Sequence, residues 1–119
     1  MDKIRFEYKK KIGISGKKFY VEVTAGLFSG SAVFDADDEY LQEIVSSLKR
    51  MYDTLSGTCN IVDSGSDYVI IESLKHGHFG VHGLIGGSYN PTHLAFELKI
   101  DQTDLKVIIS QLKTILESA

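Results

Sequence analysis

The sequence changes its hydrophobic period twice, from simple alternation to the 3.6-residue spacing of a helix. Apolar and polar residues alternate over residues 4–8 and 19–25, and a helical stripe follows over residues 41–55. Short strand-like segments then return between residues 58 and 100, before a second helical stripe over residues 105–116. Strands require the first period and amphipathic helices the second, and each helical stripe must be covered by sheet. The sequence therefore predicts an α+β domain.

About seven antiparallel strands are expected. The first three form a meander over residues 4–8, 19–25 and 31–34, with turns at Gly13–Gly16 and Phe28–Gly30. Four further strands are predicted at Thr58–Val62, Tyr68–Ser73, His78–Ile85 and His93–Ile100. In the third of these, Phe79, Val81 and Ile85 should lie on one face, and His78, His82 and Leu84 on the other.

Each helical stripe begins after an aspartate that can cap the helix. The carboxylates of Asp37 and Asp101 can accept hydrogen bonds from the unpaired N–H groups of a first helical turn. Gly57 is the expected end of the first helix, because glycine tolerates the left-handed conformation found there. The core stripes are Leu41, Ile44, Val45, Leu48, Met51, Tyr52 and Leu55, then Leu105, Ile108, Ile109, Leu112, Ile115 and Leu116.

The two helical segments resemble each other at an offset of 64 residues. The matching positions run from the capping aspartates through a shared leucine and isoleucine pattern to Lys49 and Lys113. The requirements of any capped amphipathic helix explain most of these matches. The similarity therefore does not by itself establish an internal repeat.

Length and composition place limits on the class of protein. A chain of 119 residues with 43% apolar and 24% charged residues suits one globular domain spanning residues 1–119. It contains no apolar run near the ~20 residues of a membrane span. A lone Cys59 fits a reducing compartment, so we expect a cytoplasmic protein in which this cysteine is a small buried residue.

The net charge of −3 conceals two regions of opposite sign. Residues 1–18 carry seven basic and two acidic side chains, whereas the rest of the chain carries six basic and fourteen acidic ones. An overall acidic domain is a poor general phosphate binder, so no nucleic acid is expected as a partner. The acidic charge is densest at Asp35, Asp37, Asp38, Glu39 and Glu43.

No group of residues forms a convincing catalytic or metal-binding pattern. His76, His78 and His82 share parity on one predicted strand, but residues two apart in a strand spread along it by roughly 6–7 Å. Zinc ligands instead converge on one centre at about 2 Å, from several elements, so we expect no zinc site even with His93 added. The glycines of residues 77–87 do not form a phosphate-binding loop before a helix. We therefore predict no enzyme, no metal and no cofactor.

Several segments of the second half resemble a known bacterial pattern. They are a strand of the form GHxxVxG within His76–Gly83, an LxFxL strand within His93–Leu98, and DQTxL opening a helix at Asp101–Leu105. The turn Gly26–Gly30 and the first helix fit the same scheme. The chain is similar here, over roughly residues 20–118, to the WapI-type immunity proteins of bacterial polymorphic and contact-dependent toxin systems.

The resemblance implies a stoichiometric binding protein whose partner is a cognate toxin domain, with no role for a membrane. The family's binding surfaces vary, so the choice of surface rests on charge: carboxylates would speed encounter with a basic toxin. That reasoning selects Asp35, Asp38, Glu39 and Glu43, with Asp37 set aside as the helix cap. Two alternatives stay open: a small ligand-binding or accessory domain with loop 86–91 at a pocket rim, and a metal-dependent enzyme using the histidines. Self-association is compatible with each of them.

Overall fold

Three strands form the first antiparallel sheet, in the order β1-β2-β3. They are β1 (Lys3–Ile12), β2 (Gly16–Ala25) and β3 (Phe28–Asp37), in a computed structural model that describes residues 2–63, 65–87 and 92–118. Alternation buries one face, where the Phe19 ring lies 6.2 Å from that of Phe6 and 5.9 Å from that of Phe34. The meander predicted from the sequence is therefore confirmed.

The strands of this sheet are longer than the sequence indicated. Ala25 pairs directly with Phe28, so the chain reverses at Gly26 and Leu27 and not at Phe28–Gly30. Gly26 has a φ of 62°, a left-handed conformation that a tight two-residue turn requires and glycine adopts at little cost. The predicted turn was wrong because Ser29 and Gly30 resemble turn residues but lie within β3.

Four strands form the second antiparallel sheet, in the order β4-β5-β6-β7. These are β4 (Thr58–Val62), β5 (Tyr68–Ser73), β6 (His78–Ile85) and β7 (Leu94–Asp101), with a short 3₁₀ turn, η1 (Lys75–Gly77), before β6. The predicted faces of β6 are confirmed, with Phe79, Val81 and Ile85 buried. Gly83 is required within β6 because a Cβ there would collide with the carbonyl oxygen of Tyr68.

The two helices are α1 (Asp38–Thr54) and α2 (Gln102–Glu117), and both begin at the predicted caps. Asp37 Oδ1 accepts the Tyr40 N–H at 2.7 Å, and Asp101 Oδ1 accepts the Asp104 N–H at 2.9 Å. The prediction for the end of α1 is wrong. Leu55 takes the left-handed conformation, with φ 56°, and donates its N–H to the Met51 carbonyl oxygen, so the helix ends at Thr54, three residues before Gly57. Leu55 is consequently exposed and does not join the core stripe.

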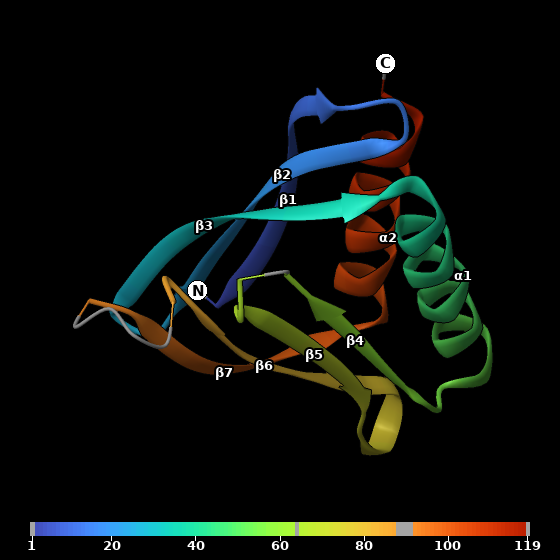
Figure 1. Cartoon of the computed structure of the whole chain (residues 1–119). Coiled ribbons are helices and arrows are strands. Elements are labelled where there is room, and N and C mark those ends of the chain that lie inside the picture. Colours follow the sequence, from blue (N-terminus) through green and yellow to red (C-terminus); the bar gives the residue numbers. More distant parts are fainter. Residues whose placement is uncertain (1, 64, 88–91, 119) are drawn as a thin grey trace.

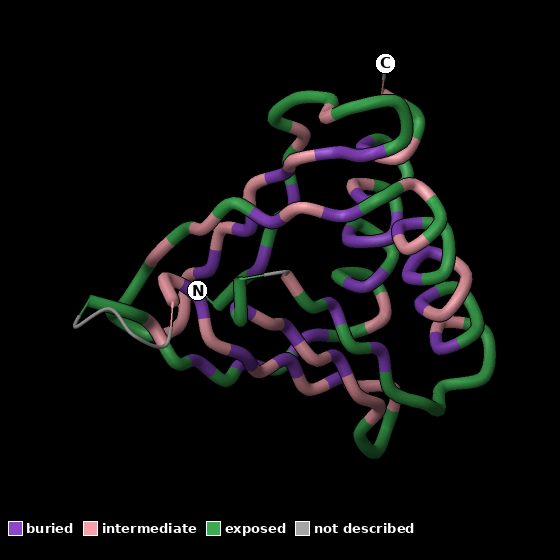
Figure 2. The backbone as a smooth tube through the Cα atoms, viewed as in Figure 1, coloured by how far each residue is buried: buried purple, intermediate pink, exposed green. Residues whose placement is uncertain are grey.

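The two sheets face each other at an angle, and the helices lie side by side where the sheets open apart (Figure 1). Buried residues follow the inward faces of both sheets and the facing sides of both helices (Figure 2). The helical stripes that reach this shared core are Leu41, Ile44, Val45, Leu48 and Met51 of α1 and Leu105, Ile108, Ile109, Leu112 and Ile115 of α2. The predicted α+β class, with seven antiparallel strands and two helices in the described residues, is confirmed.

The order of elements gives the sequence similarity of the helices a structural context. A three-stranded meander followed by a helix occurs twice, as β1-β2-β3-α1 and as β5-β6-β7-α2, with β4 added at the edge of the second sheet. The 64-residue offset that aligns the capping aspartates also brings β3 onto β7. In the described residues, neither helix combines the length and hydropathy needed to cross a membrane.

Candidate functional site

The acidic cluster predicted from the sequence surrounds the start of α1. Here the end of β3 leads directly into the helix, and the helix N-terminus favours nearby carboxylates through its partial positive charge. Asp37 is committed to capping the helix, and Asp38 and Glu39 occupy its first turn. The Asp38 N–H also donates to the Ser15 carbonyl oxygen at 2.7 Å, which holds the β1–β2 turn against this helix end.

Two lysines from β2 partly neutralise this cluster. Lys17 Nζ lies 2.7 Å from Asp38 Oδ1, and the lysine side chain is only 4% exposed. Lys18 Nζ lies 2.9 Å from Asp35 Oδ1 at a half-buried position. Sequence reasoning placed the lysine-rich hairpin and the acidic cluster in separate regions, but the register of β2 with β3 sets Lys18 directly opposite Asp35.

Asp38, which was selected for a binding surface by its charge, is therefore not a free surface charge. Its carboxylate balances the charge of an almost fully buried lysine, so Asp38 stabilises the fold. The Asp35 carboxylate pairs with Lys18, and the backbone N–H of Asp35 donates to Asp63 Oδ1 at 2.8 Å, which ties β3 to the β4–β5 connection. Glu39 and Glu43 are exposed, like the capping Asp37, and neither glutamate forms an ion pair with another residue that the structure describes.

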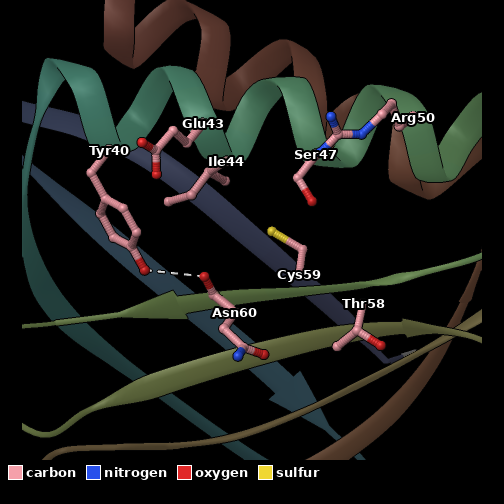
Figure 3. A pocket seen from close by; sticks show the side chains of 8 residues that line it. All are labelled: Tyr40, Glu43, Ile44, Ser47, Arg50, Thr58, Cys59 and Asn60. Carbon is pink, nitrogen blue, oxygen red and sulfur yellow. Dashed lines mark hydrogen bonds between the residues drawn. The ribbon is translucent and has the colours of Figure 1, made fainter.

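A groove continues from this acidic region along α1 and the outer edge of β4 (Figure 3). The cavity has a volume of about 370 Å³, with α1 forming one wall and β4 the other. Figure 3 shows Tyr40 and Ser47 pointing from α1 toward the strand, with Tyr40 at one end and Arg50 lying along the helix at the other. Its lining comprises Tyr40, Glu43, Ile44, Ser47 and Arg50 from the helix, and Thr58, Cys59 and Asn60 from the strand.

Cys59 lies at the floor of this groove and has the character of a core residue. It is 4% exposed and belongs to the hydrophobic core, as the sequence predicted for a small buried cysteine. Burial raises the pKa of the Cys59 thiol, and a side-chain hydrogen bond with Ser47 acts in the opposite direction. A raised pKa keeps the sulfur protonated at neutral pH, whereas nucleophilic cysteines need the thiolate. The groove therefore offers a surface for binding and no activated thiol.

The histidines do not share one strand face as their spacing indicated. His76 lies in η1 with a left-handed φ of 61°, which turns the chain before β6 begins at His78. The prediction of a common face is wrong for His76, because this residue lies before both the predicted and the observed strand, in a turn that breaks the alternation. His82 Nδ1 lies 3.9 Å from Glu72 Oε1 on the outer face of the second sheet. Among the described residues, no three histidine, cysteine or acidic side chains come together as metal ligands could.

A second cavity corresponds to the ligand-binding alternative. It has a volume of about 250 Å³ between the start of β3, the end of β6 and the start of β7, with Gly86 and His93 in its lining. The buried Asp67 carboxylate fixes the adjoining chain by accepting the N–H groups of Gly86 and Gly87 at 3.0 and 2.7 Å. Residues 88–91 of the predicted rim loop lie outside the described residues.

Solved structures with similar folds come from plants. One is titled as the plant transcriptional regulator PBF-2, with a TM-score of 0.51 and 12% identity, covering 95% of this chain and 71% of that one. The other is WHY3 from Arabidopsis thaliana, with a TM-score of 0.51 and 13% identity, covering 95% of this chain and 78% of that one. At these identities the likeness is one of fold alone. A search of curated proteins found no match.

The match to a protein family is more informative than these folds. The family model described as the immunity protein WapI-like family matches residues 17–119, which include every element from β2 to α2 except the first residue of β2. The matched region contains the acidic start of α1 and both walls of the groove, whereas β1 precedes it. The resemblance recognised from the strand and helix segments of the second half is thus confirmed, and the chain belongs to the WapI-like immunity protein family.

Proposed function

We propose that this protein neutralises a cognate toxin domain by stoichiometric binding, without turnover. The observation that carries the proposal is the immunity-family match over residues 17–119. The raised pKa of Cys59 and the dispersed histidines are consistent with a binding role. The proposed site of action is the bacterial cytoplasm, where the immunity protein would meet a toxin before it causes damage.

The surface that we propose for binding consists of the first two turns of α1 and the groove beside β4. Glu39 and Glu43 offer exposed negative charge there, and Arg50 adds one positive charge at the far end of the groove. Exposed charges at the rim of an interface act mainly by steering encounter and by excluding wrong partners. A toxin domain with a basic surface would be complementary to the acidic end.

The first test is rescue of growth. A toxin domain encoded beside this chain would be expressed with and without it in a sensitive bacterial strain. The expected result is survival only with co-expression, together with a one-to-one complex on purification. Cell death despite abundant folded immunity protein would contradict the proposed function.

The second test addresses the surface. Because Asp38 supports the buried Lys17, the informative double reversal is Glu39→Lys with Glu43→Lys. The matched control is Glu97→Lys with Glu117→Lys, which changes the net charge equally at exposed positions elsewhere. We expect the first pair to slow association about tenfold at low salt, and considerably more than the control. Equal association rates for both pairs would reject this surface while leaving the function intact.

A further inference from the structure

The backbone hydrogen bonds of β4 show which of its groups face away from the sheet. The Ser73 N–H donates to the Gly57 carbonyl oxygen at 3.0 Å, and the Asp63 N–H donates to the Asp67 carbonyl oxygen at 2.9 Å. The odd-numbered residues between these two links therefore direct their backbone groups toward β5. The even-numbered residues Thr58, Asn60 and Val62 direct theirs outward, because β4 is the edge strand of its sheet.

Tyr40 already forms hydrogen bonds with part of this edge, in place of a neighbouring strand. Its hydroxyl donates to the Asn60 carbonyl oxygen at 3.1 Å and accepts the Val62 N–H at 3.0 Å. In the described part of the chain, no group accepts the N–H of Thr58 or of Asn60. Both residues are exposed and line the groove, so these two N–H groups are open to an incoming backbone.

We propose that an extended segment of the protein partner adds to β4 as a fifth strand of this sheet, seated in the groove beside α1. An exposed strand edge pairs with a backbone in extended conformation, and side-chain pockets beside the edge then provide specificity. Two side chains of opposite charge line the helix wall of the groove, Glu43 near Tyr40 and Arg50 with its guanidinium near Ser47 (Figure 3). The complementary segment carries a basic residue beside Glu43 and an acidic one beside Arg50. This inference rests on the proposed function.

The other strand edge that faces a helix is a weaker candidate for the same role. On β1 the Phe6 N–H donates to Gln111 Oε1 of α2 at 2.9 Å, and Ile4 and Phe6 are both buried. In addition, β1 precedes the region that the family model matches, whereas β4 and α1 lie within it. A surface used by immunity proteins of this family is expected within the shared region.

Amide hydrogen exchange measured by NMR tests the pairing directly. The probe is the toxin domain encoded beside this chain, added to the full-length protein. We expect the Thr58 and Asn60 amides to exchange quickly in the free protein and at least tenfold more slowly in the complex. The amides of Cys59 and Ile61 face β5 and should be slow in both states, and the outward Ile4 amide on β1 should be unchanged.

The possible outcomes separate this inference from the function. A complex in which Thr58 and Asn60 exchange as quickly as before would overturn strand addition and leave the immunity function standing. Absence of any complex would overturn both. Protection that depends on the concentration of the immunity protein alone would identify a second copy as the occupant and also overturn the proposal.

A pair of variants gives an independent readout. Asn60→Pro removes the outward N–H without removing a hydrogen bond to β5, as edge strands tolerate, whereas Asn60→Ala keeps the N–H and removes only the side chain. We expect Asn60→Pro to weaken binding of the toxin domain at least tenfold, and Asn60→Ala to change it less than about twofold. Equal affinities for two folded variants would overturn the proposal. If Asn60→Pro does not fold, the hydrogen-exchange measurement on the unmodified protein tests strand addition by itself.

Discussion

The two helices meet strand edges in related ways but with different chemistry. At the junction of α1 with β4, the Tyr40 hydroxyl contacts an edge whose residues are exposed. At the junction of α2 with β1, Gln111 accepts the N–H of Phe6, whose side chain is 2% exposed. In both places a helix side chain accepts a hydrogen bond from a backbone N–H that points away from the sheet, which limits uncontrolled pairing with another strand. The outward residues Thr58 and Asn60 at the first junction are exposed, whereas Ile4 and Phe6 at the second are buried.

The first residues of the two helices show the same divergence. Asp38 of α1 pairs with the buried Lys17, whereas the equivalent Gln102 of α2 donates Nε2 to the Tyr52 carbonyl oxygen at 3.2 Å. The caps that precede them are both aspartate. The shared caps and apolar stripes thus determine where both helices form. The polar residues differ, so the start of α1 carries an ion pair and the start of α2 a neutral hydrogen bond.

The largest expected effect tests whether the two helices support the core equally. Leu48 and Leu112 occupy equivalent positions 64 residues apart, and both are 0% exposed. We expect Leu48→Ala and Leu112→Ala each to lower the free energy of unfolding by about 3 kcal/mol, measured by urea denaturation. If the two losses in free energy of unfolding differ by more than about 2 kcal/mol, the helices are equivalent in topology but not in their contribution to stability.

The next effect concerns the polar starts of the helices. Asp38→Asn removes the charge that balances Lys17, and we expect a loss of roughly 2 kcal/mol. This is below the cost for a fully buried pair, because the Asp38 side chain is 37% exposed. Gln102→Ala removes a neutral hydrogen bond and should cost about 1 kcal/mol. Urea titration of both variants should show this order, and a larger loss for Gln102→Ala would refute the assignment of Lys17 as a buried charge.

Sequence patterns predicted the fold better than the site, for a physical reason. Alternation, the 3.6-residue stripe and the capping aspartates are local requirements, so they identified all seven strands and both helices. The errors came where two local signals competed, as at Ser29–Gly30, or where a turn interrupted an alternating run, as at His76. The pairing of Lys17 with Asp38 depends on strand register across a sheet, and no short-range pattern encodes it.

The groove could not be predicted from the sequence either, because it too depends on tertiary structure. It requires β4 to lie at a sheet edge and α1 to run beside it, and both are tertiary facts. One sequence feature could have indicated the position of β4. This strand has no counterpart in the first β-β-β-α unit, as expected for a strand added at the edge of a sheet. The family resemblance, in contrast, was readable from caps, turns and core positions in the second half.

The caps provide the third prediction. Asp101 forms a reciprocal capping box, because Asp104 Oδ2 also accepts the Asp101 N–H at 3.2 Å. Asp37 accepts from Tyr40 N without this return bond. We therefore expect Asp101→Ala to cost about 1.5 kcal/mol and Asp37→Ala about 1 kcal/mol in urea unfolding. Helical circular dichroism at low urea concentration serves as the control that both variants still fold.

The smallest effects address the two strand edges directly. Gln111→Ala leaves the Phe6 N–H without its acceptor beside a buried side chain, so we expect a loss of about 1 kcal/mol. Tyr40→Phe frees the Asn60 carbonyl oxygen and the Val62 N–H, but both residues are exposed and water can replace the hydroxyl, so the loss should be roughly 0.5 kcal/mol. The lengthened open edge of Tyr40→Phe should in turn bind the toxin domain more tightly in calorimetry, or self-associate in sedimentation, whereas Gln111→Ala should do neither. Reduced affinity of Tyr40→Phe, with no self-association, would show that the hydroxyl contacts the partner and that the strand edge at Asn60 and Val62 stays closed in the complex.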